Sequence, residues 1–172
     1  MTDTELKDEL DEPFLRKQWV IQRVGWGVML FIILLALVGV LGTSPGASTI
    51  ASRDVGDAHY EVEHSRFSRY QLLDRMHVRV DAPGATGEEL KIAFSNEWAE
   101  NNNVRSSTPE ADGGGMGSHG ATYTFQVEDW SQPLVVAFEY EPRKAFRNPG
   151  TMTITAGASA PVSLPIDAWV YP

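Results

Sequence analysis

The stretch VGWGVMLFIILLALVGVL, residues 24–41, decides how this chain is organised. Its eighteen residues carry no charge, and twelve of them are Val, Leu, Ile or Phe. A helix rises ~1.5 Å per residue, so a run of this length covers about 27 Å, close to the ~30 Å hydrocarbon core of a bilayer. The stretch therefore predicts a single transmembrane helix.

A cleaved signal peptide is the main alternative interpretation of this stretch. Such peptides have a short basic leader and an apolar run of about 7–15 residues. Here 23 residues precede the run, and six of them are acidic. The length of the run and the acidic leader both favour a retained anchor.

The distribution of Lys and Arg predicts the direction in which the helix crosses the membrane. Lys7, Arg16, Lys17 and Arg23 precede the span, whereas Arg53 is the only base in the sixteen residues that follow it. Because loops that flank a span carry more Lys and Arg on the cytoplasmic side, we expect a cytoplasmic N-terminus. The C-terminal part is then extracytoplasmic, and the inner (cytoplasmic) membrane of a bacterium is the expected location.

Residues at the cytoplasmic entry of the span are candidates for contact with headgroups and with a partner. We assign Trp19, Arg23 and Trp26 to the membrane interface, where an indole keeps its N–H in water. Gly25 and Gly27 permit the close approach of a second helix, although they do not form a Gly-x-x-x-Gly pair. A plain stop-transfer flank is the alternative for this segment.

Composition divides the chain into four parts. Residues 1–12 are polar and acidic and predict a disordered cytoplasmic tail. Residues 13–41 predict a juxtamembrane and transmembrane helix, which Pro13 suits as a first helical residue. Residues 42–57, rich in Gly, Ser, Thr and Ala, predict a linker, and residues 58–172 predict one extracytoplasmic domain.

Apolar residues in the last part recur with a period of two, which is typical of half-buried strands. About seven such strands, separated by Pro, Gly and Asn turns, favour an all-β domain, a β-sandwich that is immunoglobulin-like in the broad sense. A small β-barrel is the alternative, and residues 96–102 predict a short helix. The alternating segments are 76–80, 90–94, 123–127, 151–155 and 162–166, with a more continuous run at 135–140.

Composition also limits the chemistry that this chain performs. The chain has no cysteine, so thiol redox chemistry, Cys nucleophiles and Cys-ligated metals are excluded. The absence of disulfides fits a bacterial envelope protein. Residues 58–172 contain nine Lys or Arg and fifteen Asp or Glu, and this excess of acids argues against nucleic-acid binding.

No constellation of residues predicts a catalytic, metal or cofactor site. His59 and His64 are five residues apart and face opposite sides of a regular strand, so they do not converge on a metal. The glycine-rich segment 112–120 lacks the Gly-Lys-Ser/Thr ending of a phosphate-binding loop and predicts a flexible connection. Ser118 and His119 are adjacent, but no nucleophile elbow surrounds them.

Exposed aromatic residues are the better candidates for a contact site. In the last strand Trp169 and Tyr171 project away from the core parity, so we assign them as candidate partner contacts. Trp98 and Trp130 lie in predicted connections and are further candidates, with packing beneath a loop as the alternative.

Basic residues form two clusters in the chain. If one cluster faces the bilayer, it contacts lipid phosphates or an acidic partner; ordinary solvated charges are the alternative. The members are Arg66, Arg69, Arg75 and Arg79 in the first cluster, and Arg143, Lys144 and Arg147 in the second.

The entry to the span contains the motif Arg16-Lys-Gln-Trp19, followed by Gln22-Arg23-x-Gly25-Trp26. Ser44-Pro45-Gly46 follows the span, and Phe67-Ser-Arg69-Tyr70 lies near the first strand. With these motifs the chain resembles a family of small uncharacterised bacterial single-pass membrane proteins with one extracytoplasmic β domain. The resemblance implies an accessory subunit beside other membrane proteins and brings no catalytic residue with it.

We therefore expect a non-catalytic, membrane-anchored accessory or scaffolding subunit. Its expected partners are the lipid bilayer and a membrane or envelope protein. A module that binds or senses a small molecule or a lipid headgroup is the alternative, and a metal-dependent hydrolase is the third hypothesis. No cofactor is expected.

Overall fold

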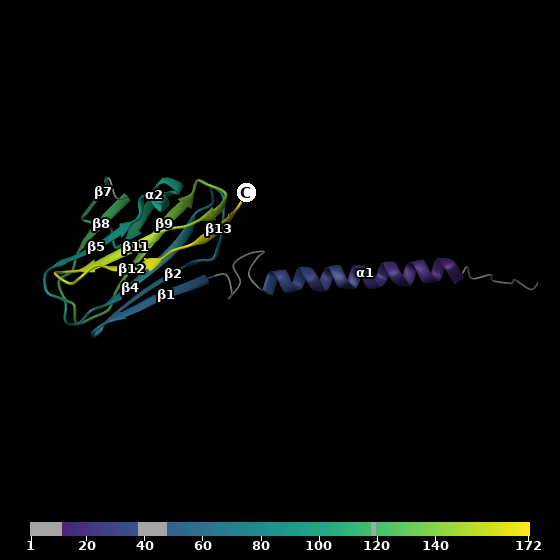
Figure 1. The fold of residues 1–172 in the computed structure, drawn as a ribbon, viewed down its shortest axis with the longest axis horizontal. Coiled ribbons are helices and arrows are strands. Elements are labelled where there is room, and N and C mark those ends of the chain that lie inside the picture. Colours follow the sequence, from purple (N-terminus) through teal and green to yellow (C-terminus); the bar gives the residue numbers. More distant parts are fainter. Residues whose placement is uncertain (1–11, 38–47, 118–119) are drawn as a thin grey trace, which may run out of the picture.

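The computed structural model describes residues 12–37, 48–117 and 120–172. An N-terminal apolar helix, α1 (Glu12–Leu37), precedes an all-β domain (Figure 1). From Lys17 to Leu37 the helix is long and apolar enough to cross a membrane. Residues 1–11 of the predicted tail, 38–41 of the predicted span and 42–47 of the predicted linker lie outside the described residues.

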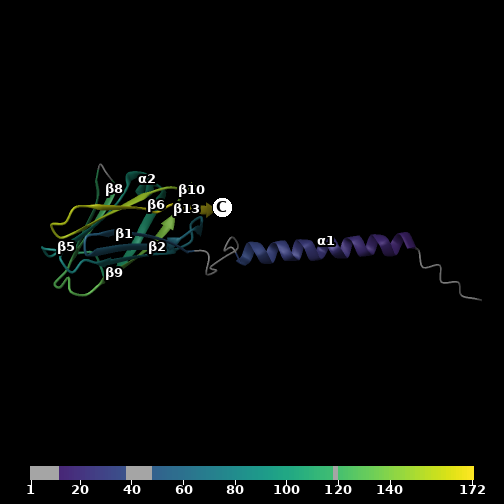
Figure 2. The ribbon, with the colours of Figure 1, turned by 60° about the horizontal axis from the view of Figure 1, so that its bottom comes forward.

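Two five-stranded antiparallel sheets pack face to face, as the period-two pattern predicted (Figure 2). The first sheet has the order β1 (Ser48–Val55), β2 (Ala58–Ser65), β4 (Asp74–Asp81), β9 (Leu134–Pro142), β6 (Asn102–Thr108). The second sheet has the order β12 (Val162–Pro165), β11 (Thr151–Ala156), β5 (Glu89–Phe94), β8 (Gly120–Gln126), β7 (Gly113–Gly117). The prediction of a β-sandwich is confirmed.

A third, short sheet and one short helix complete the domain. The short sheet has the order β10 (Phe146–Asn148), β13 (Ala168–Tyr171), β3 (Phe67–Arg69), and β13 runs parallel to β3. The predicted helix is present as α2 (Asn96–Asn101).

The core lies between the two large sheets because each strand alternates apolar and polar side chains. Val62, Val78 and Val136 of the first sheet are fully buried. Ile92 and Ile154 of the second sheet are fully buried as well. Each of the two large sheets thus packs one face into the core. The outer faces, the edges and the ends of the sandwich remain available for contact with other molecules.

The two tryptophans of the connections belong to this core, so the packing alternative holds for both of them. Trp98 on α2 is 2% exposed and stacks on Phe94 with ring centroids 4.2 Å apart. Trp130 is 8% exposed, and its Nε1–H donates a hydrogen bond to the Gly87 carbonyl oxygen at 2.6 Å. Trp98 is buried because α2 folds under the end of the sheets. Trp130 can be buried because its indole N–H finds an acceptor.

Two segments that lacked a strand pattern nevertheless form edge strands. Residues 48–55 were predicted as linker but pair as β1 along the whole length of β2. Gly113–Gly117 was predicted as a flexible connection but pairs as β7 with β8. An edge strand has only one neighbour and buries little, so neither segment needs alternating large apolar residues.

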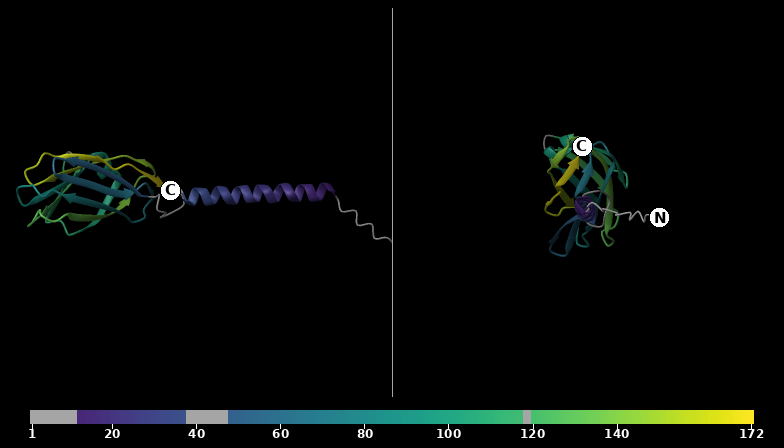
Figure 3. Two further views of the ribbon diagram at one scale, coloured as in Figure 1. Left: turned by 90° about the horizontal axis from the view of Figure 1, so that it is seen from below. Right: turned by 90° about the vertical axis from the view of Figure 1, so that its right-hand side faces the viewer.

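The sandwich has two distinct ends, which we name after the path of the chain (Figure 3). The tether end is where β1 begins at Ser48, the first described residue after α1; the far end holds the turn between Val55 and Ala58. Ser48 pairs with Ser65, so β2 ends and β3 follows at the tether end. β13 and the C-terminus lie at this end as well (Figure 1).

Replacing Gly150 with alanine is expected to destabilise the domain. A Cβ atom there would lie 2.6 Å from Cδ1 and 2.7 Å from Cβ of Trp98, which is held in the core. We expect a loss of about 1–3 kcal/mol in the free energy of unfolding, as for other overpacked sites. Denaturant unfolding followed by circular dichroism measures it.

Gly84→Ala is the matched control, because a Cβ atom there has nothing within 4 Å. We expect its unfolding free energy to stay within about 0.5 kcal/mol of the parent. Equal stability of the two variants would contradict the packing described for Trp98.

Candidate functional site

The interface residues predicted on α1 form one small cluster. Trp19 is 54% exposed and Trp26 is 64% exposed. The guanidinium carbon of Arg23 lies 3.7 Å from the centroid of the Trp19 ring. This stacking is a cation–π contact between residues four apart on one helix face, and it keeps the charge of Arg23 next to an amphipathic ring.

The two glycines of the same segment are open but do not form one groove. Gly25 and Gly27 have no atom within 4 Å of an added Cβ. Two residues along a helix correspond to about 200° around its axis. The glycines therefore lie on nearly opposite faces of the helix, and a single partner helix does not reach both of them.

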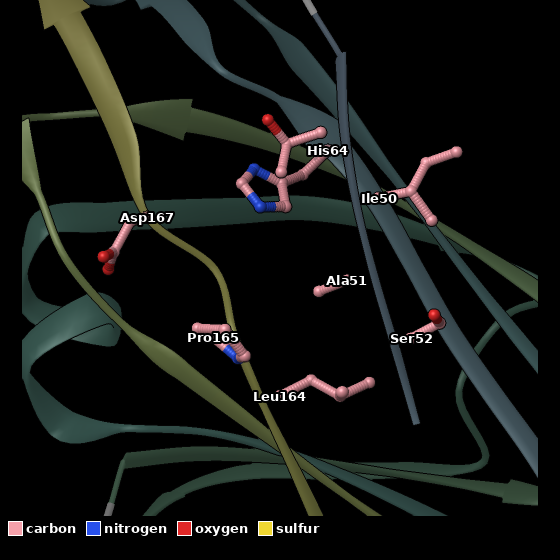
Figure 4. Close-up of a pocket in the computed structure, with 8 residues that line it drawn as sticks. Ile50, Ala51, Ser52, His64, Leu164, Pro165 and Asp167 are labelled. Atoms are coloured by element: carbon pink, nitrogen blue, oxygen red, sulfur yellow. The ribbon is translucent and has the colours of Figure 1, made fainter. Parts of the chain in front are cut away.

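A pocket of about 520 Å³ opens where the edges of the two large sheets meet, between β1 and β12 (Figure 4). Ala51, Leu164 and Pro165 give it apolar walls, while His64 and Asp167 face it from two sides. Side chains alternate along β1, so Ile50 and Ser52 point away from the centre of the pocket. The full lining is Thr49, Ile50, Ala51, Ser52, His64, Leu164, Pro165 and Asp167.

His64 is the buried polar group of this pocket. It is 3% exposed, and its Nδ1 lies 3.1 Å from the carbonyl oxygen of Ser65. Burial lowers the pKa of His64, although the Ser65 carbonyl and the Asp167 and Asp74 carboxylates oppose this shift. A neutral ring that donates from Nδ1 to Ser65 has Nε2 left as a hydrogen-bond acceptor.

Asp167 supplies the second acceptor. Its Oδ1 accepts a hydrogen bond from the Gly150 N–H at 3.1 Å, and its Oδ2 lies 3.8 Å from Nη2 of Arg147. Together with Nε2 of His64 it gives the pocket two hydrogen-bond acceptors, which suit groups that carry N–H or O–H donors. The apolar walls favour a donor borne on an aliphatic or ring-shaped body.

The histidine that was weighed as a surface metal ligand is engaged differently. His59 has Nδ1 at 2.5 Å from Oδ1 of Asp54 and Nε2 at 3.5 Å from Oε2 of Glu61. These contacts raise the pKa of His59, the one with Asp54 most strongly. Within the described residues no group of three or more His, Asp or Glu side chains is arranged to hold a metal ion.

The predicted contact residues of the last strand lie on the short sheet at the tether end. Trp169 is 44% exposed and meets Phe146 of β10 edge to face, with ring centroids 6.2 Å apart. Tyr171 is half-buried and stacks on Phe67 of β3 at 5.9 Å. The two side chains thus project from a folded sheet, as their strand parity predicted.

Other exposed apolar residues at the same end escaped the sequence analysis. Tyr70, Leu72 and Leu73 occupy the connection between β3 and β4 and are 42%, 56% and 51% exposed. Phe146 is 60% exposed at the start of β10. The sequence could have indicated these residues, because each is a large apolar residue inside a turn or a basic loop. Strand periodicity does not require an apolar residue at such a position.

Comparisons with known proteins give no family. No family model matches the chain, and no curated protein matches it. A Bacteroides ovatus GH5 xyloglucanase, solved with a XXXG heptasaccharide, is similar at 14% identity and a TM-score of 0.33, covering 64% of this chain and 19% of that chain. The match thus spans about a fifth of the xyloglucanase. A chain of a type I cohesin–dockerin complex from Clostridium thermocellum is similar at 9% identity and a TM-score of 0.36, covering 61% of this chain and 83% of that one.

The two histidines with shifted pKa values predict opposite effects of pH on stability. The folded pKa of His64 lies below 6.5, so its contribution to stability is lost as the pH falls from 6.5 through that pKa. The folded pKa of His59 lies above 6.5, so its contribution is present below 6.5 and lost as the pH rises through that pKa. On acidification from about pH 7 to about pH 5, His64→Gln should lose less stability than the parent and His59→Gln more.

Thermal unfolding tests these two predictions. The unfolding midpoints of the parent and the two variants are measured as a function of pH in one detergent. Each variant controls for the other, because both remove an imidazole of the same strand, β2. Three parallel curves would contradict the environments described for these rings.

Proposed function

We propose that the chain is a single-pass protein of the bacterial inner membrane that holds its β-sandwich on the extracytoplasmic side. Its role is that of a non-catalytic accessory or scaffolding subunit, which presents the sandwich to a membrane or envelope protein. The bias of Lys and Arg toward the N-terminal flank supports this direction of insertion. The exposed apolar surface of α1 supports the anchoring.

The observation that carries the proposal is the open edge of the sandwich at β1. This strand pairs with β2 on one side, and no described strand pairs with its other side. Residues 48–52 carry neither a charge nor a proline, the two devices that commonly protect an edge. By contrast, the neighbouring edge strand β12 ends on Pro165.

The uncharged part of this free edge, residues 48–52, is suited to the addition of a strand from a partner. The added strand would bind through its backbone, and the side chains that it turns inward would supply specificity. The pocket between β1 and β12 lies at this edge, and its acceptors are His64 and Asp167. The expected partner segment is therefore extended and carries a hydrogen-bond donor, such as a Lys or Asn side chain, at the position over the pocket.

Site-specific photocrosslinking in living cells tests this contact. A benzoylphenylalanine residue replaces Ile50, which is 59% exposed on β1. Val135, 48% exposed on the interior strand β9, is the matched control. We expect one discrete crosslinked envelope protein from position 50 that is absent from position 135.

The contrary outcome is also clear. Equal crosslinking from both positions, together with a solitary monodisperse monomer in mild detergent, would contradict a subunit that presents its edge to a partner.

A small-molecule receptor is the second candidate, because the same pocket also has the size of a ligand site. Its volume of about 520 Å³ falls in the range of ligand pockets. Amines and polyols combine the donors that His64 and Asp167 accept with a compact body. A ligand of this class should raise the unfolding temperature of the parent but not of Ala51→Leu, which fills the pocket.

Val135→Leu is the control for that substitution, because it adds a methylene group on an outer sheet face away from the pocket. An unfolding temperature that no amine or polyol raises would reject the receptor and leave the strand-addition proposal intact.

A further inference from the structure

Most of the exposed large apolar side chains of the described β domain lie at the tether end, where they are close together. The residues come from three separate segments of the chain, the β3–β4 connection, β10 and β13. Elsewhere in the described domain, exposed large apolar residues such as Val55 and Val135 stand singly. We call the cluster the tether-end patch; its members are Tyr70, Leu72, Leu73, Phe146 and Trp169.

Hydrogen bonds between these segments show that the patch is one surface. The Tyr70 N–H donates to the Tyr171 carbonyl oxygen at 2.7 Å, which joins the β3–β4 connection to β13. The Gln71 N–H donates to the carbonyl oxygen of Pro142 at 2.9 Å, which joins the same connection to the end of β9. Phe146 and Trp169 are in ring contact.

Two residues of this surface hold a backbone conformation that their side chains disfavour. Gln71 has φ +57° and Phe146 has φ +77°, and they are the non-glycine residues with positive φ among those described. A bulky residue in this region is strained, and such strain persists only where surrounding structure enforces it. Here the strained backbone accompanies exposed rather than buried side chains, so packing of the core does not explain it.

Polar side chains beneath this surface are hydrogen-bonded to one another and hold its segments in place. Oδ1 of Asp74 accepts a hydrogen bond from the Ser65 hydroxyl at 2.7 Å, and its Oδ2 accepts one from the Ser68 hydroxyl. The side chains of Asn102 and Asn148 are buried and donate to each other at 3.2 and 2.8 Å. The tether-end patch is therefore presented by a rigid base.

Charge is distributed unequally between the two ends of the sandwich. Exposed bases surround the patch, and of these Arg147 alone forms an ion pair with a described carboxylate. The far end is acidic instead. The bases of the tether end, which outnumber the exposed acids Glu97 and Glu100 of α2 and Asp167 at this end, are Arg66, Arg69, Arg143, Lys144 and Arg147. The acids of the far end, which outnumber the base Arg53 beside them, are Asp54, Asp57, Asp81, Glu88, Glu128 and Asp129.

The membrane anchor attaches at the same end. Ten residues, 38–47, separate α1 from β1. Even a fully extended chain of ten residues spans at most about 35 Å. The patch is thus confined to the neighbourhood of the membrane into which α1 inserts.

We propose that the tether-end patch docks on the anionic phospholipid surface of the membrane that α1 spans, with its aromatic and leucine side chains among the acyl-chain boundary and its bases on the lipid phosphates. Aromatic residues prefer this boundary, and Arg and Lys extend their charged groups from it toward phosphate. The acidic far end then points away from the negatively charged surface. This proposal rests on the anchoring stated above. If the tether end lies on the membrane, the open edge at β1 faces sideways, parallel to the membrane plane.

A protein partner of this patch is the competing occupant. The alternation of bases with apolar side chains and the short tether favour the lipid surface. A test in the absence of any other protein separates the two.

Single-cysteine spin labelling of the full chain in nanodiscs provides that test. The chain has no cysteine, so Leu72→Cys and Trp169→Cys label single sites in the patch. Val55→Cys and Val135→Cys are the controls, because both residues are exposed apolar residues outside it. The nanodiscs contain equal parts of phosphatidylcholine and phosphatidylglycerol, or phosphatidylcholine alone.

The measured quantity is the accessibility of the label to oxygen, which concentrates in lipid, relative to a water-soluble nickel complex. We expect a ratio several-fold higher at positions 72 and 169 than at 55 and 135 in the anionic nanodiscs. The difference should shrink without phosphatidylglycerol, in high salt and in the Arg143→Gln/Lys144→Gln variant, because screening or removal of charge weakens attraction to phosphate. Circular dichroism confirms that each labelled chain retains its β structure.

Equal ratios at all four positions in the anionic nanodiscs would overturn the proposal. So would a high ratio at positions 72 and 169 that does not depend on lipid charge or on Arg143 and Lys144. The first result would leave the patch to a protein partner. The second would mean that apolar contacts alone hold the patch on lipid, without the proposed contacts of its bases with phosphate. Since the nanodiscs contain no other protein, a failure of the accessory role proposed above leaves this result unaffected.

Discussion

The closure of the sandwich core is the constraint on which the rest of the domain depends. Two five-stranded sheets bury one complete face of their interior strands against each other, with residues such as Val78 and Ile92 fully enclosed. That packing contributes the stability of the domain in the absence of disulfides. It also leaves recognition to the outer faces, the edges and the ends of the sandwich. The aromatic contacts of Trp98 with Phe94 and Tyr140 close the core at the tether end, so the surface there rests on a rigid floor.

Local patterns in the sequence predicted what local physics determines. Strand periodicity identified the β-sandwich, and the outward parity of Trp169 and Tyr171 was correct because both follow from alternation along one strand. The same rules missed β1 and β7, since edge strands bury too little to show a pattern. The sequence left Trp98 undecided between contact and packing, because its burial depends on α2 folding beneath the end of the sheets.

The tether-end patch shows where a single sequence gives too little information. Leu72, Phe146 and Trp169 are far apart in the chain and come together only through pairing of β13 with β3 and β10. No local rule reports a non-local pairing of three short strands. The pocket has the same origin, because His64 of β2 and Asp167 of the connection after β12 are brought to it by different parts of the fold. An anchored domain that rests one end on lipid would hold this pocket at a fixed height and direction, which is what a subunit that presents a binding edge requires.

The side of the membrane on which the sandwich lies decides whether these surfaces serve as proposed. Accessibility of single cysteines to a membrane-impermeant maleimide in intact spheroplasts measures it directly, with Val55→Cys on the far end and Thr4→Cys before the span. Labelling of position 55 from outside, with position 4 labelled only after lysis, is the expected result. Labelling of position 4 in intact spheroplasts while position 55 stays protected, or release of the intact chain from vesicles by alkaline carbonate, would contradict an anchored extracytoplasmic domain.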